Sequence, residues 1–79
     1  MTEILQEQIE RARRTARIWM DEWRKHKDFS SYIAATWAVA KYAALVELMI
    51  NGKNPDAEQH QQALLALRNT EGFEEWRPK

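Results

Sequence analysis

The sequence predicts an all-α fold: an antiparallel helical hairpin of two long helices plus a shorter third helix, a small bundle that is completed by oligomerisation. Three observations carry this prediction. The first third of the chain repeats apolar residues at helical spacings, residues 32–50 form an almost unbroken apolar run, and the 79 residues include only two glycines and two prolines. So few turn-forming residues argue against a β-rich fold. We treat residues 1–79 as a single helical domain.

The first helix is predicted at about residues 3–27. Its apolar positions alternate between spacings of four and three residues, which is typical of a seam between packed helices. The seam consists of Leu5, Ile9, Ala12, Ala16, Trp19, Trp23 and His26. The other side of this helix carries opposite charges one turn apart, such as Glu7 and Arg11, and is expected to face water.

The second helix is predicted at about residues 31–50. Asp28, Ser30 or Ser31 provides its N-cap, because each has a side-chain oxygen that accepts a backbone N–H. Asn51 or Gly52 is expected in the left-handed conformation that ends many helices.

Two apolar stripes run along this second helix. One consists of Ala35, Val39, Tyr42, Val46 and Met49, and the other of Ile33, Trp37, Ala40, Ala44 and Leu48. The stripes are offset by two residues, roughly 200° on a helix, so they face opposite ways. One is expected to pack on the first helix. The other, which the third helix covers only in part, is predicted to be the self-association surface.

The third helix is predicted at about residues 55–68, with Asn54 as N-cap and Pro55 at its first position. Its apolar residues are Ala57, Leu64 and Leu67 on one face, with Leu65 beside them. A short turn at residues 70–76 is expected to bring Phe73 and Trp76 together. We expect this aromatic tail to fold back on its own bundle, with docking on a partner as the alternative.

The apolar run also has the length of a membrane span. Lys41 at its middle and Glu47 near one end argue against insertion, since a central charge costs ~2.5–3.5 kcal/mol. Lys41 is instead expected on a strip between the two stripes, with Thr36 or Glu47 near the same boundary, its stem on apolar surface and its ammonium in water. The opening residues lack a signal peptide pattern, so a cytoplasmic location is the expectation.

No catalytic, cofactor-binding or metal-binding residue is predicted. Glu22 with His26, and Asp56 with His60, place a carboxylate and an imidazole one turn apart, but such pairs are also ordinary surface neighbours. The chain has no cysteine. Its adjacent serines at positions 30 and 31 are better explained as helix caps, so we expect no enzyme.

A row of arginines on the first helix, Arg13, Arg17 and Arg24, is a candidate for contact with phosphates or with a partner protein. Acidic residues lie among them, and the chain has 12 basic and 12 acidic residues. The third helix has no basic residue near its start that would read DNA bases, which argues against a helix-turn-helix. The predicted partner-binding residues are Arg13, Arg17, Arg24, Phe73 and Trp76.

These features favour a small non-enzymatic protein-binding module, an adaptor, regulator or inhibitor of the kind found among bacterial or phage accessory proteins. Its expected partners are a second copy of the chain and another protein. One alternative is a nucleic-acid-associated regulator that uses the arginines of the first helix. The other is a small accessory subunit of a larger enzyme complex.

Overall fold

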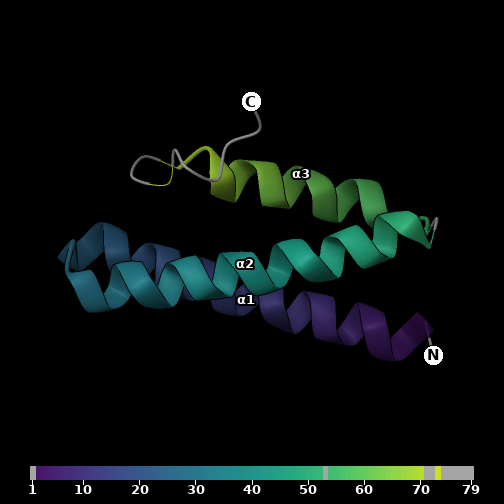
Figure 1. Cartoon of the computed structure of the whole chain (residues 1–79), viewed down its shortest axis with the longest axis horizontal. Coiled ribbons are helices and arrows are strands. Elements are labelled where there is room, and N and C mark those ends of the chain that lie inside the picture. The colour runs from purple at the N-terminus through teal and green to yellow at the C-terminus, as the bar shows by residue number, and fades with distance from the viewer. Residues whose placement is uncertain (1, 53, 71–72, 74–79) are drawn as a thin grey trace.

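The computed structural model describes residues 2–52, 54–70 and 73. These residues form three α-helices and no strand: α1 (Thr2–His26), α2 (Phe29–Asn51) and α3 (Ala57–Arg68). The all-α class is therefore confirmed, and each helix lies close to its predicted range. Figure 1 shows α2 lying along α1, with α3 beside them on one side.

The turn between α1 and α2 consists of Lys27 and Asp28. Lys27 has a φ of 54°, in the left-handed region, and its N–H donates to the carbonyl of Trp23 at 2.7 Å, which closes α1. Asp28 is extended and occupies the N-cap of α2. Because Asp28 takes the cap, α2 begins at Phe29, earlier than predicted, and neither Ser30 nor Ser31 is the cap.

The end of α2 differs from the prediction. Gly52 has a φ of −80°, in the right-handed region, and its N–H donates to the carbonyl of Leu48 at 3.0 Å. Lys27 is the one non-glycine residue with positive φ in the described part of the chain, so Asn51 is not left-handed either. The chain keeps turning in the helical sense instead, and the N–H of Asn54 reaches the carbonyl of Met49.

The start of α3 is also later than predicted. The side-chain oxygen of Asn54 accepts the N–H of Asp56 at 3.1 Å, and its backbone carbonyl accepts the N–H of Ala57 at 3.0 Å. Asn54 therefore closes a turn before the helix, in the way that asparagine commonly does. Asp56 stands at the N-cap, and α3 begins at Ala57.

The molecule is flat. Its Cα atoms extend over 37 × 27 × 14 Å, and Figure 1 looks down the shortest of these axes. Packed helices lie about 8–10 Å apart and the Cα atoms of each lie about 2.3 Å from its axis, so a Cα extent of 14 Å has room for two layers of helices. Among the described residues, one side of α2 consequently has no other helix over it (Figure 1).

The seam of α1 is correct except at Trp19 and His26, since Leu5 and Trp23 also pack against the core. Ile9, Ala12 and Ala16 are buried as predicted. Trp19 is 39% exposed, whereas Met20 is 1% exposed and takes the core position. Both residues lie within the apolar arc of α1, so spacing alone does not choose between them. His26, the last predicted position, is exposed and pairs with Glu22.

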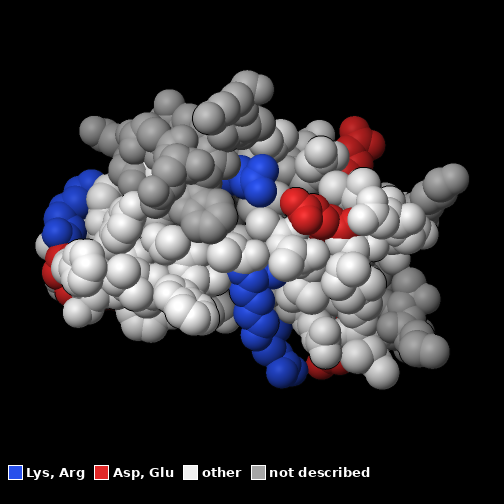
Figure 2. All heavy atoms as spheres, viewed as in Figure 1, with Lys and Arg blue, Asp and Glu red and all other residues white. Residues whose placement is uncertain are grey.

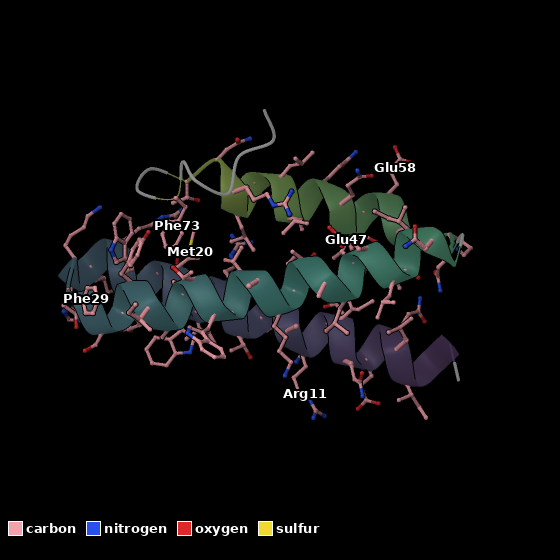
Figure 3. All side chains as sticks on the ribbon, viewed as in Figure 1. Arg11, Met20, Phe29, Glu47, Glu58 and Phe73 are labelled. Atoms are coloured by element: carbon pink, nitrogen blue, oxygen red, sulfur yellow. The ribbon has the colours of Figure 1, made fainter. Side chains whose placement is uncertain are left out.

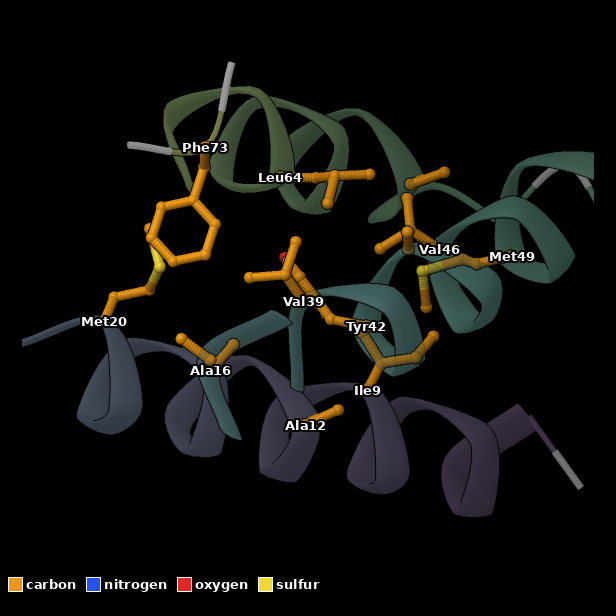
Figure 4. Close-up of a cluster of buried hydrophobic side chains, with 13 residues drawn as sticks. Ile9, Ala12, Ala16, Met20, Val39, Tyr42, Val46, Met49, Leu64 and Phe73 are labelled. Carbon is orange, nitrogen blue, oxygen red and sulfur yellow. The ribbon is translucent and has the colours of Figure 1, made fainter. Parts of the chain in front are cut away.

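The stripe of α2 from Ala35 to Met49 is the centre of the core, and all five of its residues are fully buried. The expectation that α3 covers the opposite stripe is wrong. Figure 4 shows Val39 and Val46 between Leu64 of α3 above them and Ile9 of α1 below them, in one buried cluster. Both neighbouring helices thus cover one stripe of α2 and leave the other open.

Candidate functional site

The outer face of α2 is an apolar face that no other described helix covers. We use this name for the second stripe, Ile33, Trp37, Ala40, Ala44 and Leu48. Trp37 is 76% exposed, Leu48 60% and Ile33 40%. Figure 2 shows a largely uncharged surface over α2, crossed near its middle by blue side chains. The structure therefore brings the predicted self-association residues onto one open helical face.

Beside this face a cleft of about 450 Å³ separates α1 from α2. Its lining residues are Gln8, Arg11, Ala12, Thr15, Ala38, Lys41 and Leu45. The cleft exists because both helices carry alanines here, which leave space between the two backbones. Arg11 and Lys41 place two positive charges along it, and no acidic residue lines it.

Lys41 is exposed, as predicted, and it lines this cleft together with Ala38 and Leu45. The residues expected near the same boundary lie elsewhere. Figure 3 shows Glu47 on the edge of α2 that faces α3, whereas Arg11, which shares the cleft with Lys41, lies on the opposite edge. Six residues rotate by roughly 600° along a helix, so Glu47 lies about 120° around α2 from Lys41. The hydroxyl oxygen of Thr36 is buried and has no hydrogen-bond partner among the described residues.

A second cleft, of about 140 Å³, lies between α1 and α3 and brings together Arg13, Arg17 and Arg24. Its apolar wall consists of Met20, Ala63, Ala66 and Leu67. Two of the arginines are already engaged. Arg13 binds the carboxylate of Glu10 at 3.1 Å, and Arg24 donates to the hydroxyl of Thr70 at 3.1 Å and lies 3.4 Å from Asp21.

The junction of the three helices is a buried hydrogen-bonded group that sequence reasoning missed. The hydroxyl of Tyr42 donates to the backbone carbonyl of His60 at 3.0 Å and lies 3.2 Å from its Nδ1. The other ring nitrogen, Nε2, lies 3.6 Å from a carboxylate oxygen of Glu10. One residue from each helix therefore meets at this point.

Burial and the neighbouring Arg13 shift the pKa values of Tyr42 and Glu10 in this junction. Burial raises the pKa of Tyr42 to about 12. The side-chain hydrogen bond from Arg13 is the main cause that lowers the pKa of Glu10 below its usual value. Glu10 is thus a carboxylate at neutral pH, with Arg13 on one side and the imidazole of His60 on the other.

The interpretation of His60 as a surface neighbour of Asp56 is wrong, because the side chain of His60 is nearly fully buried. The signal was its spacing, three residues after Ala57 and four before Leu64, which continues the apolar face of α3. Asp56 instead accepts a hydrogen bond from the side chain of Gln6. The other candidate pair, Glu22 and His26, is in contact at 3.2 Å on the surface of α1. In the described part of the chain, no three potential ligands gather in a way that suits a metal ion.

An aromatic cluster closes the end of the bundle near the α1–α2 turn. Phe73 is fully buried, and its ring centroid lies 5.2 Å from that of Trp23 and 5.2 Å from that of Tyr32. Lys27 covers the outer side of Trp23, with its Nζ 3.8 Å from the ring centroid. Phe73 therefore packs on its own bundle, and we remove it from the candidate partner surface. Trp76, its predicted companion, lies outside the described residues.

By length and composition, α2 is also able to cross a membrane, although the core helix of a globular protein has the same features. Comparison of this chain with protein-family models, with curated proteins and with solved structures finds no match.

Proposed function

We propose that this protein is a small non-enzymatic module that acts by binding proteins through helical surfaces, as an adaptor, regulator or inhibitor does. The observation that supports the proposal is the outer face of α2, where Trp37 and Leu48 are mostly exposed. Exposed apolar patches rimmed by polar residues mark interaction sites, and aromatic residues often dominate their binding energy.

Self-association is the first use that we propose for this face. In this proposal α1 and α2 form an antiparallel hairpin, and a second copy of the chain completes the bundle by covering the outer face of α2. The flat shape supports it, because a chain of 79 residues that spreads its helices over 37 × 27 Å buries little apolar surface by itself. A larger protein that occupies the same face would make the chain an accessory subunit instead.

We keep a cytoplasmic location as part of the proposal rather than a membrane-spanning one. Ala35, Val39 and Val46 are already buried against α1 and α3. Crossing a membrane would require α2 to leave these partners, and the exposed Lys41 at its middle would then enter hydrocarbon.

Sedimentation of matched charge variants tests the proposal. Leu48→Glu is the test variant and places a charge on the outer face of α2. Ile18→Glu is the control and places a charge on α1. Both side chains are 60% exposed, but Ile18 lines a different hollow, with Arg14 and Arg17. At micromolar concentration we expect the unchanged chain and the Ile18→Glu variant to sediment as dimers or larger species, and Leu48→Glu to sediment as a monomer.

A mass near 9.4 kDa for the unchanged chain at every concentration would contradict self-association. Equal loss of assembly in both variants would show that the contact is not specific to the outer face of α2. Circular dichroism of each variant checks that its helices are retained.

The cleft of Arg13, Arg17 and Arg24 favours a second candidate, an anionic partner bound between α1 and α3. If that partner is nucleic acid, affinity should fall steeply with salt and should be lost in an Arg13→Ala/Arg17→Ala variant. Glu10 and Asp21 already engage two of the arginines, so we expect only non-specific binding, with a dissociation constant of ~10⁻⁴–10⁻⁶ M at physiological salt.

A further inference from the structure

The outer face of α2 is self-complementary when two copies run in opposite directions. Ile33 and Trp37 lie as far before the midpoint between Ala40 and Lys41 as Leu48 and Ala44 lie after it. A two-fold axis through this midpoint therefore places four members of the stripe at the level of another member, and Ala40 at the level of Lys41. The same axis relates Ser30 to Asn51, which are exposed polar residues at the two ends of the stripe.

The sizes of these residues match only in this orientation. In the antiparallel arrangement, Trp37 of one copy lies opposite Ala44 of the other, and Ile33 lies opposite Leu48. Facing positions that alternate large and small side chains fill space well. In a parallel arrangement, the two Trp37 side chains would meet at one level and the two Ala44 side chains would leave a gap at another.

Lys41 lies at one edge of the outer face of α2, beside the cleft that it lines with Arg11. The antiparallel axis places the two Lys41 side chains along the same edge of the contact rather than inside it. Each ammonium then reaches water from this edge while its stem covers apolar surface.

From this register we propose that two copies of the chain pair antiparallel through the outer face of α2, about a two-fold axis between Ala40 and Lys41, with Trp37 of each copy seated on Ala44 of the other. This inference rests on the proposed self-association and adds its orientation and register. Neither the arginine cleft nor the buried His60 junction takes part in the contact.

Single-cysteine variants test the orientation, because the chain has no cysteine of its own. Ile33→Cys and Leu48→Cys are mixed, one of them carrying a size tag, and oxidised without denaturant. The antiparallel pair brings the two introduced thiols together, whereas two copies of the same variant hold theirs about 22 Å apart along the helix. We expect a tagged–untagged cross-link in the mixture, little cross-linking of either variant alone, and none when Ile18→Cys replaces Ile33→Cys.

The size swap is a second test. Trp37→Ala should weaken the dimer by removing a contact, and Ala44→Trp should weaken it by a clash. The double variant should bind about tenfold more tightly than the two single effects predict, because the large and small residues still face each other. Residues that do not touch would give additive effects.

The outcomes separate this inference from the function on which it rests. Cross-linking of Ile33→Cys with itself would establish a parallel pair and overturn the proposed orientation. A dimer in sedimentation with no cross-link at either position, or with additive effects in the swap, would also overturn it by placing the contact elsewhere. A monomer in sedimentation would overturn the self-association itself.

Discussion

At the scale of single residues, the Tyr42–His60–Glu10 junction is where the three helices are held in register. The hydroxyl of Tyr42 has one proton, and it is donated to the backbone carbonyl of His60. The same oxygen is then free to accept a hydrogen bond from Nδ1 of His60 in the tautomer that carries its proton there, whereas the tautomer with its proton on Nε2 directs it toward the carboxylate of Glu10, 3.6 Å away. Buried polar groups that are fully paired rigidify a core, and those that lose a partner destabilise it.

Tyr42 leads to a prediction about alkaline pH. Its pKa is raised from 10.0 to about 12 by burial, so the folded state keeps the phenol proton that the unfolded chain loses near pH 10. The unfolded state then binds fewer protons than the folded state, and the free energy of unfolding must fall as pH rises from 10 toward 12.

Denaturant unfolding at neutral and alkaline pH measures this effect. Tyr42→Phe should cost about 0.5–1.5 kcal/mol at neutral pH, because it removes the hydrogen bond that Tyr42 donates to the carbonyl of His60. It should also remove part of the alkaline loss of stability. The unchanged chain, measured under the same conditions, should show the whole alkaline loss. If Tyr42→Phe and the unchanged chain lose stability equally above pH 10, the buried phenol of Tyr42 is not the cause of the loss.

At the scale of helices, the sequence predicted where the elements lie and which face of α2 forms the core. Both follow from short-range signals: the spacing of apolar residues and the side chains that start and end helices. The choice of Met20 over Trp19 in α1, and the side of α2 that α3 covers, could not be predicted in this way. Each depends on contacts between helices, such as that of Tyr42 with His60, which periodicity within one helix does not contain.

Lys41 provides the prediction at this scale. It is exposed beside the outer face of α2, and its partners in the cleft are Arg11 and polar or small residues rather than a carboxylate. Lys41→Met should therefore leave the fold intact and change the free energy of unfolding of the isolated chain by less than ~1 kcal/mol. Urea unfolding at a protein concentration too low for assembly measures this change in free energy. Lys25→Met, at an exposed position of α1, is the control. A loss of several kcal/mol would mean that Lys41 is a buried, paired residue.

At the scale of the whole molecule, the core explains why assembly is expected. Much of it consists of alanine, which removes little apolar surface from water. The buried alanines are Ala12, Ala16, Ala35, Ala43 and Ala57. Large apolar side chains such as Trp37 and Ile18 remain on the surface. Composition and length predicted that the chain buries too little apolar surface by itself. The expectation that the aromatic tail folds back agrees with the burial of Phe73. Its particular neighbours, Trp23 and Tyr32, and the approach of three arginines to α3 depend on how the chain returns and could not be predicted.

Because a partner that binds only the folded state adds to its stability, folding and assembly should be linked. A second copy present at a hundred times its dissociation constant would contribute about 2.7 kcal/mol. The melting temperature of the unchanged chain should therefore rise with protein concentration. Trp37→Glu, which places a charge on the outer face of α2, should give a lower melting temperature that does not depend on concentration. The two proteins should converge at high dilution, where both are monomers. Differential scanning calorimetry over a wide concentration range measures this, and a constant melting temperature for the unchanged chain would show that the fold does not depend on a second copy.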